Sequence, residues 1–178
     1  MKNLFLILLV AVLVVSCKPN NEQKTTEKKE VKATEKVITV AEGPNCFISI
    51  LGRDTARLEL NVTGDRFDGF LYYLPFETDS SLGSYEGTVH GDTLKGMFRF
   101  ISEGLVSYEE VYFLMDGNKL KEGVGELEFR NDTTVVFSPQ KAVSFGESYV
   151  FEKAECKDNF ISDEVKDFYF QYNPGNFQ

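Results

Sequence analysis

The chain has 178 residues and a formal net charge of −9, from 28 acidic and 19 basic side chains, with three cysteines, one histidine and no tryptophan. The length suits about one domain. With 42% hydrophobic and 13% aromatic residues the chain can fill a core, which excludes a wholly disordered or fibrous protein. The acidity argues against nucleic acid as a partner, because phosphate binding needs a basic surface.

The N-terminus has the layout of a secretory signal peptide. Lys2 provides a positive start, an unbroken apolar run of twelve residues follows over 4–15, and Ser16 precedes Cys17. Twelve helical residues rise about 18 Å, well short of the ~30 Å hydrocarbon core of a bilayer, so a membrane-spanning anchor is not expected. The sequence therefore predicts a signal peptide over residues 1–16.

The end of this segment, Leu13-Val14-Val15-Ser16-Cys17, resembles the lipobox of bacterial lipoproteins, with Val14 in place of the commoner leucine. The resemblance implies that Cys17 receives a thioether-linked diacylglycerol and becomes an acylated N-terminus after cleavage before it. Two or more buried acyl chains, at ~0.8 kcal/mol per CH₂, hold a protein stably on a membrane. The alternative is an ordinary secretory signal with a chance cysteine, although no Ala-x-Ala cleavage site lies nearby.

Residues 17–44 are expected to form the lipidated cysteine and a disordered tether. The stretch 18–44 is rich in Lys, Glu and Thr and has few large apolar residues, so it cannot bury enough surface to order itself. Such a coil spans on the order of 30 Å. Lys18 is not the aspartate that marks inner-membrane retention in some bacteria. We therefore expect an outer-membrane lipoprotein of the cell envelope, on either its periplasmic or its outer side.

The negative charge lies in the remaining domain. Residues 45–178 hold 12 basic and 23 acidic side chains, a net charge of −11. Such a charge repels anionic lipid and favours a basic protein partner at low salt. Acidity that only aids solubility is the alternative.

An internal repeat organises this domain. The segment 62–69 aligns with 89–96 and with 115–120, at offsets of 27 and 26 residues, and each copy centres on Gly-Asp or Gly-Asn between runs of β-branched and aromatic residues. This pattern is typical of a two-residue hairpin turn, in which glycine supplies a positive φ. Three evenly spaced hairpins predict an antiparallel meander.

The strands that extend from these turns leave almost no room for helix. Closing eight or nine sequential strands into a ring removes both exposed edges. We expect residues 45–178 to form an all-β domain, an antiparallel up-and-down β-barrel of 8–9 strands with a short C-terminal helix, and a β-sandwich is the alternative. The pattern resembles the lipocalin and avidin group of small barrels. The expected strands are 46–51, 55–63, 66–76, 83–90, 93–101, 106–116, 119–129, 132–138 and 147–153.

Period-two alternation assigns an inner wall rich in aromatic residues. On this wall Gly87 and Gly96 are expected to face each other across a two-residue turn. The two missing side chains either leave room for a ligand or let the sheet bend sharply, and we favour the bend. The candidate ligand cavity is lined by Leu71, Tyr73, Tyr85, Gly87, Gly96, Phe98, Phe100, Val111 and Phe113.

The C-terminal segment predicts a helix that begins at Ser162. Its apolar residues Val165, Phe168, Tyr169 and Tyr172 recur at the helical period, and we expect this face to cover the apolar outer face of strand 66–76 or 106–116. The alternative is a stripe of exposed aromatic residues that docks another protein.

Cys46 and Cys156 lie in or beside the first and last expected strands, which become neighbours if the barrel closes. Because an export signal implies an oxidising compartment, we expect a disulfide between them. Closing a loop of roughly 110 residues is worth nearly 5 kcal/mol on the chain-entropy model. Two unpaired thiols are the alternative.

Signals for catalysis are weak, and we predict no catalytic residues, no metal site, no cofactor and no enzymatic activity. His90 is expected to lie outward beside a turn. Glu109 and Glu110 are neighbours on one strand, so they point to opposite faces. An inward Glu109 is either a buried charge that needs a partner, such as Arg99 or a ligand, or a water-exposed group at the strand end.

The sequence leaves three function classes for the domain, of which an enzyme has only the permission of the fold and no residues that support it. The first is a non-enzymatic binding module for a small apolar or mixed ligand, supported by the aromatic inner wall. The second is a protein-interaction role as an adaptor, a stress sensor or an acidic inhibitor of a basic envelope enzyme, supported by the negative charge.

Overall fold

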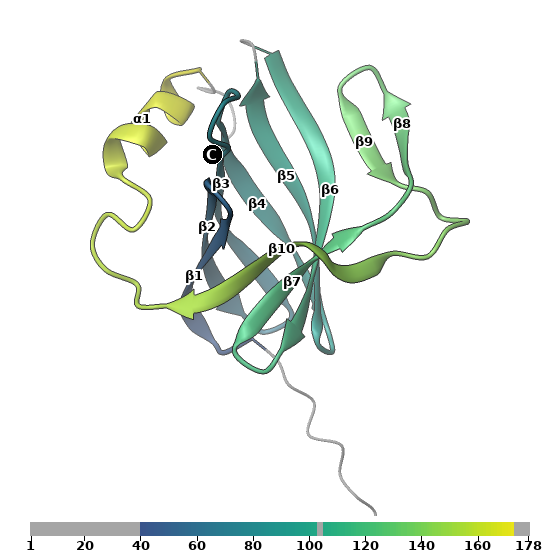
Figure 1. The fold of residues 1–178 in the computed structure, drawn as a ribbon, viewed down its shortest axis with the longest axis horizontal. Coiled ribbons are helices and arrows are strands. Elements are labelled where there is room, and N and C mark those ends of the chain that lie inside the picture. The colour runs from purple at the N-terminus through teal and green to yellow at the C-terminus, as the bar shows by residue number, and fades with distance from the viewer. Residues whose placement is uncertain (1–39, 103–104, 173–178) are drawn as a thin grey trace, which may run out of the picture. The chain divides into compact units, whose positions relative to one another are not determined.

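A computed structural model describes residues 40–102 and 105–172 of the chain. These residues form ten β-strands and one α-helix (Figure 1). The elements are β1 (Gly43–Leu51), β2 (Asp54–Thr63), β3 (Arg66–Leu74), β4 (Ser81–His90), β5 (Thr93–Ser102), β6 (Leu105–Asp116), β7 (Lys119–Val124), β8 (Leu127–Asn131), β9 (Thr134–Phe137), β10 (Ser144–Ala154) and α1 (Asp163–Tyr172).

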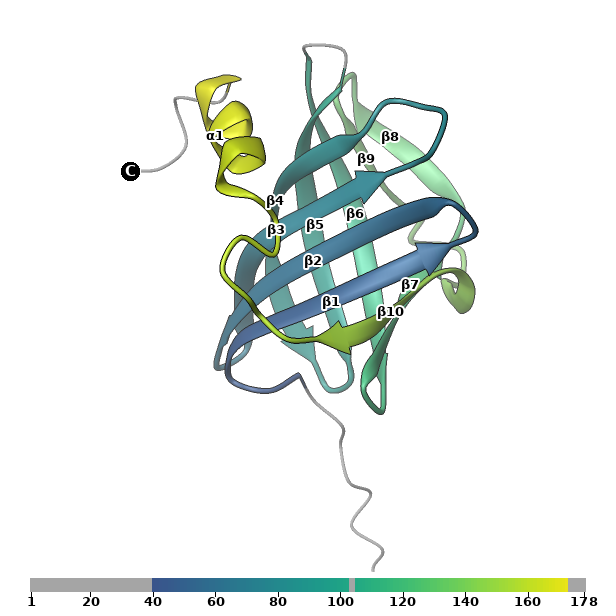
Figure 2. The ribbon, with the colours of Figure 1, turned by 60° about the vertical axis from the view of Figure 1, so that its left-hand side comes forward.

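Eight of the strands close into an antiparallel barrel. Strands β1 to β7 follow one another as a meander, and β10 pairs with both β7 and β1. The pairing of β5 with β6 completes the ring, and Figure 2 shows the wall formed by β1, β2, β3 and β10. The expected up-and-down barrel is therefore confirmed, and the alternative of a β-sandwich is wrong.

The glycine repeat marks three hairpin turns. Gly64, Gly91 and Gly117 have φ angles of 62°, 63° and 63°, in the left-handed region that only glycine adopts at no cost. The flanking residues pair across each turn, for example His90 with Thr93. These are the two-residue turns that the repeat predicts, and they set the register of six strands.

The expected single strand over 119–129 is wrong. Strand β7 ends at Val124, and after Gly125 and Glu126 the chain forms the β8–β9 hairpin, which leaves the barrel wall. Strand β9 then takes the place beside β6, in a short parallel pairing that starts at Tyr108 and Thr134. The apolar residues change parity at this break, from Leu120 and Val124 to Leu127 and Phe129, which the expectation of one continuous strand did not take into account.

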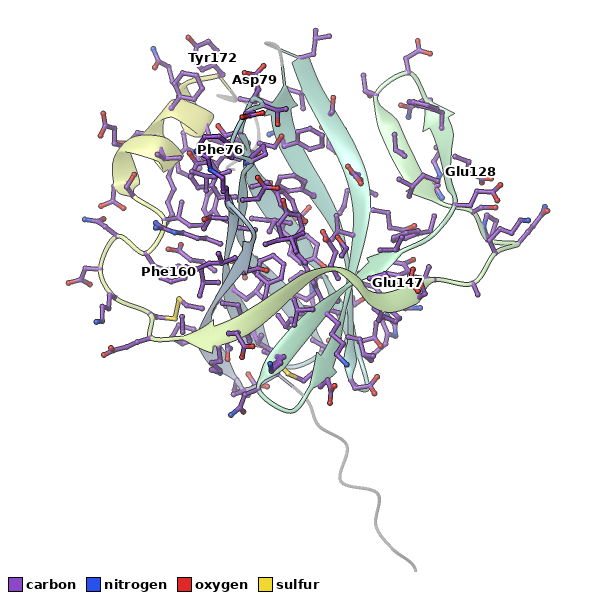
Figure 3. All side chains as sticks on the ribbon, viewed as in Figure 1. Phe76, Asp79, Glu128, Glu147, Phe160 and Tyr172 are labelled. Atoms are coloured by element: carbon purple, nitrogen blue, oxygen red, sulfur yellow. A yellow bond between two sulfur atoms is a disulfide. The ribbon has the colours of Figure 1, made fainter. Side chains whose placement is uncertain are left out.

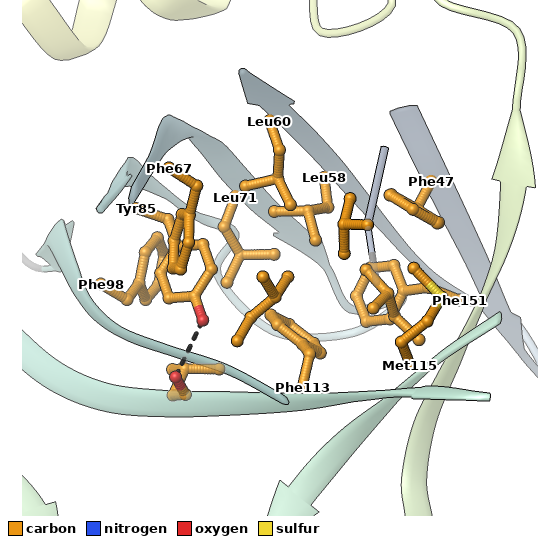
Figure 4. Close-up of a cluster of buried hydrophobic side chains, with 14 of the residues drawn as sticks. Phe47, Leu58, Leu60, Phe67, Leu71, Tyr85, Phe98, Phe113, Met115 and Phe151 are labelled. Carbon is orange, nitrogen blue, oxygen red and sulfur yellow. Dashed lines mark hydrogen bonds between the residues drawn. The ribbon is translucent and has the colours of Figure 1, made fainter. Parts of the chain in front are cut away.

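The barrel core follows the predicted alternation. Phe67, Tyr85 and Phe113 are almost fully buried, with ring centroids 4.8 Å apart for Phe67 and Tyr85 and 5.6 Å apart for Tyr85 and Phe113 (Figure 4). The Tyr85 hydroxyl donates a hydrogen bond of 2.9 Å to the carbonyl of Val111, so this buried polar group is satisfied. Burying each such ring contributes roughly 1.5–3 kcal/mol.

Helix α1 packs on the outer face of the barrel. Tyr169 is 1% exposed and lies with Ile161 against Leu82, and its hydroxyl accepts a hydrogen bond of 2.9 Å from the Arg99 guanidinium. The helix therefore covers the outer face of β3 and β4. Of the two strands that the sequence offered, 66–76 and 106–116, it covers the first. The outer face of β6 is covered by the β8–β9 hairpin instead, where the ring centroids of Tyr112 and Phe137 are 4.8 Å apart.

The helix face that packs is not entirely the predicted one. Phe168 and Tyr172 are 57% and 56% exposed and lie against each other instead. The carboxylate of Glu59 accepts a hydrogen bond from the Ile161 backbone and pairs with Lys166, so the face that carries Lys166 turns toward the barrel. The spacing of apolar residues carries no information about this ion pair, so it predicts the wrong buried face for part of the helix.

The predicted disulfide is confirmed. Cys46 and Cys156 are bonded, with their Cα atoms 5.2 Å apart and a sequence separation of 110. The bond lies beside the pairing of Cys46 with Ala154, which joins the first and last strands of the barrel.

Candidate functional site

The two ends of the barrel are built differently. At the turn end lie the three glycine hairpins, which connect β2–β3, β4–β5 and β6–β7. At the loop end lie the β1–β2 turn, where Gly52 also has a positive φ of 65°, the β3–β4 and β5–β6 connections, the last residues of β7 and the first residues of β10. Two acidic residues of the interior, Glu109 and Glu122, lie toward the loop end, whereas the buried Asn45 lies toward the turn end, so the candidate site is described from the loop end.

Glu122 of β7 points into the barrel and is held on three sides. Its carboxylate accepts hydrogen bonds from the Tyr73 hydroxyl, the Ser148 hydroxyl at 2.6 Å and the backbone N–H of Tyr149. Burial raises the pKa of Glu122, and these hydrogen bonds oppose that shift. Because Tyr73 comes from β3 and Ser148 from β10, the carboxylate links strands that are not neighbours in the wall.

Glu109 of β6 also points inward, as the alternation predicts. Burial and then the negative charge of Glu122 raise the pKa of Glu109. Among the described residues its side chain forms no hydrogen bond and no ion pair. The suggested partner Arg99 lies on the outer face, where it donates to Tyr108 at 3.1 Å.

Aromatic rings surround the two carboxylates. The ring centroid of Tyr73 lies 5.8 Å from that of Phe98 and 5.4 Å from that of Tyr149, and Phe98 stacks on Phe100 with centroids 4.7 Å apart. Burial and the nearby charges of Asp54 and Glu122 raise the pKa of Tyr149. This lining combines apolar faces with hydroxyl groups and negative charge, which suits a ligand of mixed character.

The nine residues of the candidate cavity divide between core and loop end. Leu71, Tyr85, Phe98, Val111 and Phe113 are at most 6% exposed and belong to the packed core, while Tyr73 and Phe100 are partly buried at the loop end. The loop-end residues Tyr73 and Phe100 lie on the same side of the barrel as Glu109 and Glu122. The structure therefore brings part of the expected lining together with two carboxylates.

Neighbouring side chains fill the space beside the paired glycines. Gly87 and Gly96 face each other, as predicted. A Cβ atom on Gly96 would lie 2.5 Å from the Tyr85 ring and 2.8 Å from the Phe67 ring. The rings of Phe67 and Tyr85 therefore occupy the space that the missing side chains leave at this level of the barrel.

Three cavities among the described residues lie on the outside of the barrel wall, and none is lined by the nine predicted residues. A cavity of about 530 Å³ lies between the outer face of β6 and the β8–β9 hairpin, beside Tyr112 and Phe137. One of about 450 Å³ lies between α1 and Leu82, and one of about 330 Å³ lies beside the disulfide.

Exposed apolar side chains surround the loop end. We define the apolar rim as Ile50, Leu51, Phe76 and Leu105, which are 70%, 52%, 48% and 70% exposed. They come from three separate connections of the barrel, and Figure 3 labels Phe76 beside β3. Several exposed apolar residues gathered at one end are typical of a binding surface.

The remaining candidates have ordinary surroundings. His90 is exposed, as expected, and its Nε2 lies 2.9 Å from the Thr88 hydroxyl. Glu110 points outward and accepts a hydrogen bond from the Tyr112 hydroxyl at 2.7 Å. Within residues 40–102 and 105–172, no three His, Cys, Asp or Glu side chains are arranged to hold a metal ion.

Sequence reasoning missed Glu122, Ser148 and Tyr149. The alternation that places Leu120 inward places Glu122 inward as well, so this signal was present in the strand. Ser148 and Tyr149 lie within the stretch between Phe145 and Val150 in which the register of β10 with β7 shifts. Simple alternation does not survive such a bulge.

The predicted signal peptide over 1–16, the lipidation of Cys17 and most of the tether lie outside the described residues. In the part of the chain that the structure covers, no helix is long and apolar enough to cross a membrane. None of the protein-family models, curated proteins or solved structures compared with this chain matches it.

Proposed function

We propose that the protein is a lipid-anchored, non-enzymatic binding module of the cell envelope, whose barrel takes a small ligand with an apolar body and a cationic group at its loop end. The single observation that carries this proposal is Glu109, a mostly buried carboxylate without a partner among the described residues. A buried charge without a partner is costly, and a ligand cation would offset that cost.

The surroundings of Glu109 favour an amine that carries an apolar body. Glu122 is already hydrogen-bonded, so it adds negative charge while its own geometry stays fixed. The partly buried rings of Tyr73 and Phe100 offer faces for apolar contact and for cation–π attraction. The net charge of −11 over residues 45–178 attracts cations toward the domain from a distance.

The lipid anchor rests on the lipobox resemblance at Cys17. Replacing Cys17→Ser is expected to release the protein from the membrane fraction, because no acyl chains are then attached. Mass spectrometry of the N-terminal peptide checks the modification itself. A Cys17→Ser protein that stays in the membrane fraction would contradict the anchor.

Binding is tested with a matched pair of probes, dodecylammonium and dodecanol, titrated calorimetrically below their aggregation concentrations. We expect the ammonium to bind more tightly than the alcohol. Glu109→Gln should weaken binding of the ammonium about tenfold or more and leave binding of the alcohol unchanged, because a charge-assisted hydrogen bond contributes about 1.5–3 kcal/mol. The matched control is Glu86→Gln, an exposed carboxylate on β4. Equal affinity of both probes for the wild type would contradict the proposal.

A role in protein interaction is the second candidate, favoured by the apolar rim. An adaptor, a stress sensor or an acidic inhibitor of a basic envelope enzyme would use these exposed side chains as its contact surface. Replacing Ile50→Ser together with Leu105→Ser should abolish capture of such a partner and leave binding of dodecylammonium intact. The two functions are thereby separated.

A further inference from the structure

The β8–β9 hairpin ends in a free sheet edge. Strand β8 is the last strand in the sheet order, and it pairs with β9 on one side only (Figure 1). No other strand of the described chain pairs with its second edge. All five residues of β8 are exposed, and Phe129 and Leu127 are 77% and 43% exposed. Such an edge is a template for another strand.

The charges of β8 have no ion-pair partners in the described part of the chain. Among the described residues neither Glu128 nor Arg130 forms an ion pair, whereas the neighbouring Glu126 pairs with Lys141 at 3.6 Å. Figure 3 shows Glu128 on this outermost strand. Edge strands are often protected by charges and bulges, and β8 has a register shift between Phe129 and Asn131 that leaves Arg130 without a partner on β9. Charges of one sign would repel a second copy of the strand. The two charges of β8, Glu128 and Arg130, have opposite signs and can attract their counterparts in a second copy.

We infer that β8 is a homodimerisation edge, which pairs antiparallel with β8 of a second copy across a two-fold axis at Phe129. In this register Glu128 of each copy lies opposite Arg130 of the other, and the two Phe129 side chains meet on the axis. Opposite charges and aromatic pairs directly across an antiparallel ladder are stabilising, each by roughly 0.2–1 kcal/mol relative to an alanine pair.

The sequence of β8 disfavours the neighbouring symmetric registers. An axis at Glu128 brings the two Glu128 carboxylates face to face, and an axis at Arg130 does the same for the two guanidinium groups. Like charges directly opposite each other are destabilising. The register with Phe129 on the axis is therefore the one in which every charge of β8 meets its opposite, which is why a second copy of this chain fits the edge.

The test uses the full-length protein in detergent, at far fewer than one protein per micelle, with Phe129→Cys as a reporter of the axis. We expect Phe129→Cys to form a disulfide-linked dimer under mild oxidation, whereas Leu127→Cys, which lies opposite Asn131 in this register, should form at least about tenfold less. Equal crosslinking at both positions would overturn the register.

Charge variants on the Phe129→Cys background test the pairing itself. Glu128→Arg alone or Arg130→Glu alone should each lower crosslinking about tenfold, because two attractive pairs become repulsive. Mixing the two variants in equal amounts should restore crosslinking as a heterodimer, as should the double variant. The matched control is Glu147→Arg, which changes the charge of an exposed residue on β10 by the same amount as Glu128→Arg. This control should have no effect on crosslinking.

The result that would overturn the inference is crosslinking that ignores these charges, or a wild-type protein that sediments as a monomer at every concentration. Persistent dimers in both single variants would assign the contact to another surface. Restoration by mixing cannot arise from misfolding, because each single variant would then be defective by itself. The inference does not depend on ligand binding, since β8 lies outside the barrel wall.

Discussion

The turn end and the loop end of the barrel differ in how their interior polar groups are satisfied. At the turn end, glycine hairpins and the packed rings of Phe67 and Tyr85 lie near the buried side chain of Asn45, which is hydrogen-bonded to Ala41, Gly43 and Lys153. At the loop end, Glu109 and Glu122 are buried among aromatic residues, and apolar side chains are exposed around them. The comparison indicates that buried polar groups are satisfied at the turn end, while the loop end retains one mostly buried carboxylate, Glu109, that forms no hydrogen bond or ion pair among the described residues.

The largest expected effect is on the packed core. Phe113→Ala removes a fully buried ring that contacts Tyr85 and Phe151, so the free energy of unfolding should fall by about 3–5 kcal/mol. Phe100→Ala at the loop end should cost less, because that ring is only partly buried. Urea denaturation measures both, and an equal loss for the two would erase the proposed difference between the ends.

The disulfide is expected to stabilise the turn end without affecting the ligand site. Replacing Cys46→Ala together with Cys156→Ala should lower the free energy of unfolding by about 2–5 kcal/mol. Binding of dodecylammonium by the folded fraction should not change, because the bond lies away from the loop end. A variant with normal stability but lost binding would contradict this separation.

The hydrogen bond from Tyr73 to Glu122 should have an intermediate effect. Tyr73→Phe leaves the ring and removes the hydroxyl, so a buried carboxylate loses one of its three donors, at a cost of about 1–3 kcal/mol. Thermal denaturation measures the loss. Ser84→Ala serves as a control on the outer face, since the Ser84 hydroxyl lies 3.0 Å from that of Tyr169 instead.

The smallest expected effect is a pH dependence of stability. Burial raises the pKa of Glu109 and of Glu122 above the ordinary 4.5. Between pH 4.5 and the raised pKa, the folded state therefore binds more protons than the unfolded chain. Stability from these groups is therefore greatest below pH 4.5 and is lost as the pH rises through the raised pKa. Glu109→Gln should remove its share and stabilise the protein at pH 7 by on the order of 1 kcal/mol.

Glu86→Gln, on an exposed position of β4, provides the control for this pH series. The difference between wild type and Glu109→Gln should grow with pH, while the difference for Glu86→Gln should stay flat. A wild type more stable than Glu109→Gln at pH 7 would indicate that Glu109 has a partner in the folded protein.

The barrel could be predicted because local signals repeat. Positive φ at Gly64, Gly91 and Gly117 needs glycine, and strict alternation between those turns assigns the faces without knowledge of the neighbouring strands. The disulfide follows from closure, since the first and last strands must meet. These features depend on residues close together in the sequence or on the topology that they impose.

The features that could not be predicted depend on contacts across the fold. The exposed side of α1 is set by the ion pair of Lys166 with Glu59, which are over a hundred residues apart. After the break at Val124, β9 takes the place beside β6, and no local pattern indicates this pairing. Glu122 was predictable from alternation, but its partners Tyr73 and Ser148 meet only in the closed barrel.

The most direct test of the central claim is native mass spectrometry of the protein purified from its source, with Glu109→Gln purified in parallel. The account predicts an added mass of a small molecule with a basic amine on the wild type, and a much smaller bound fraction on Glu109→Gln. The bare protein mass in both, under conditions that preserve dodecylammonium binding, or an adduct that Glu109→Gln retains in full, would contradict a cation-binding loop end.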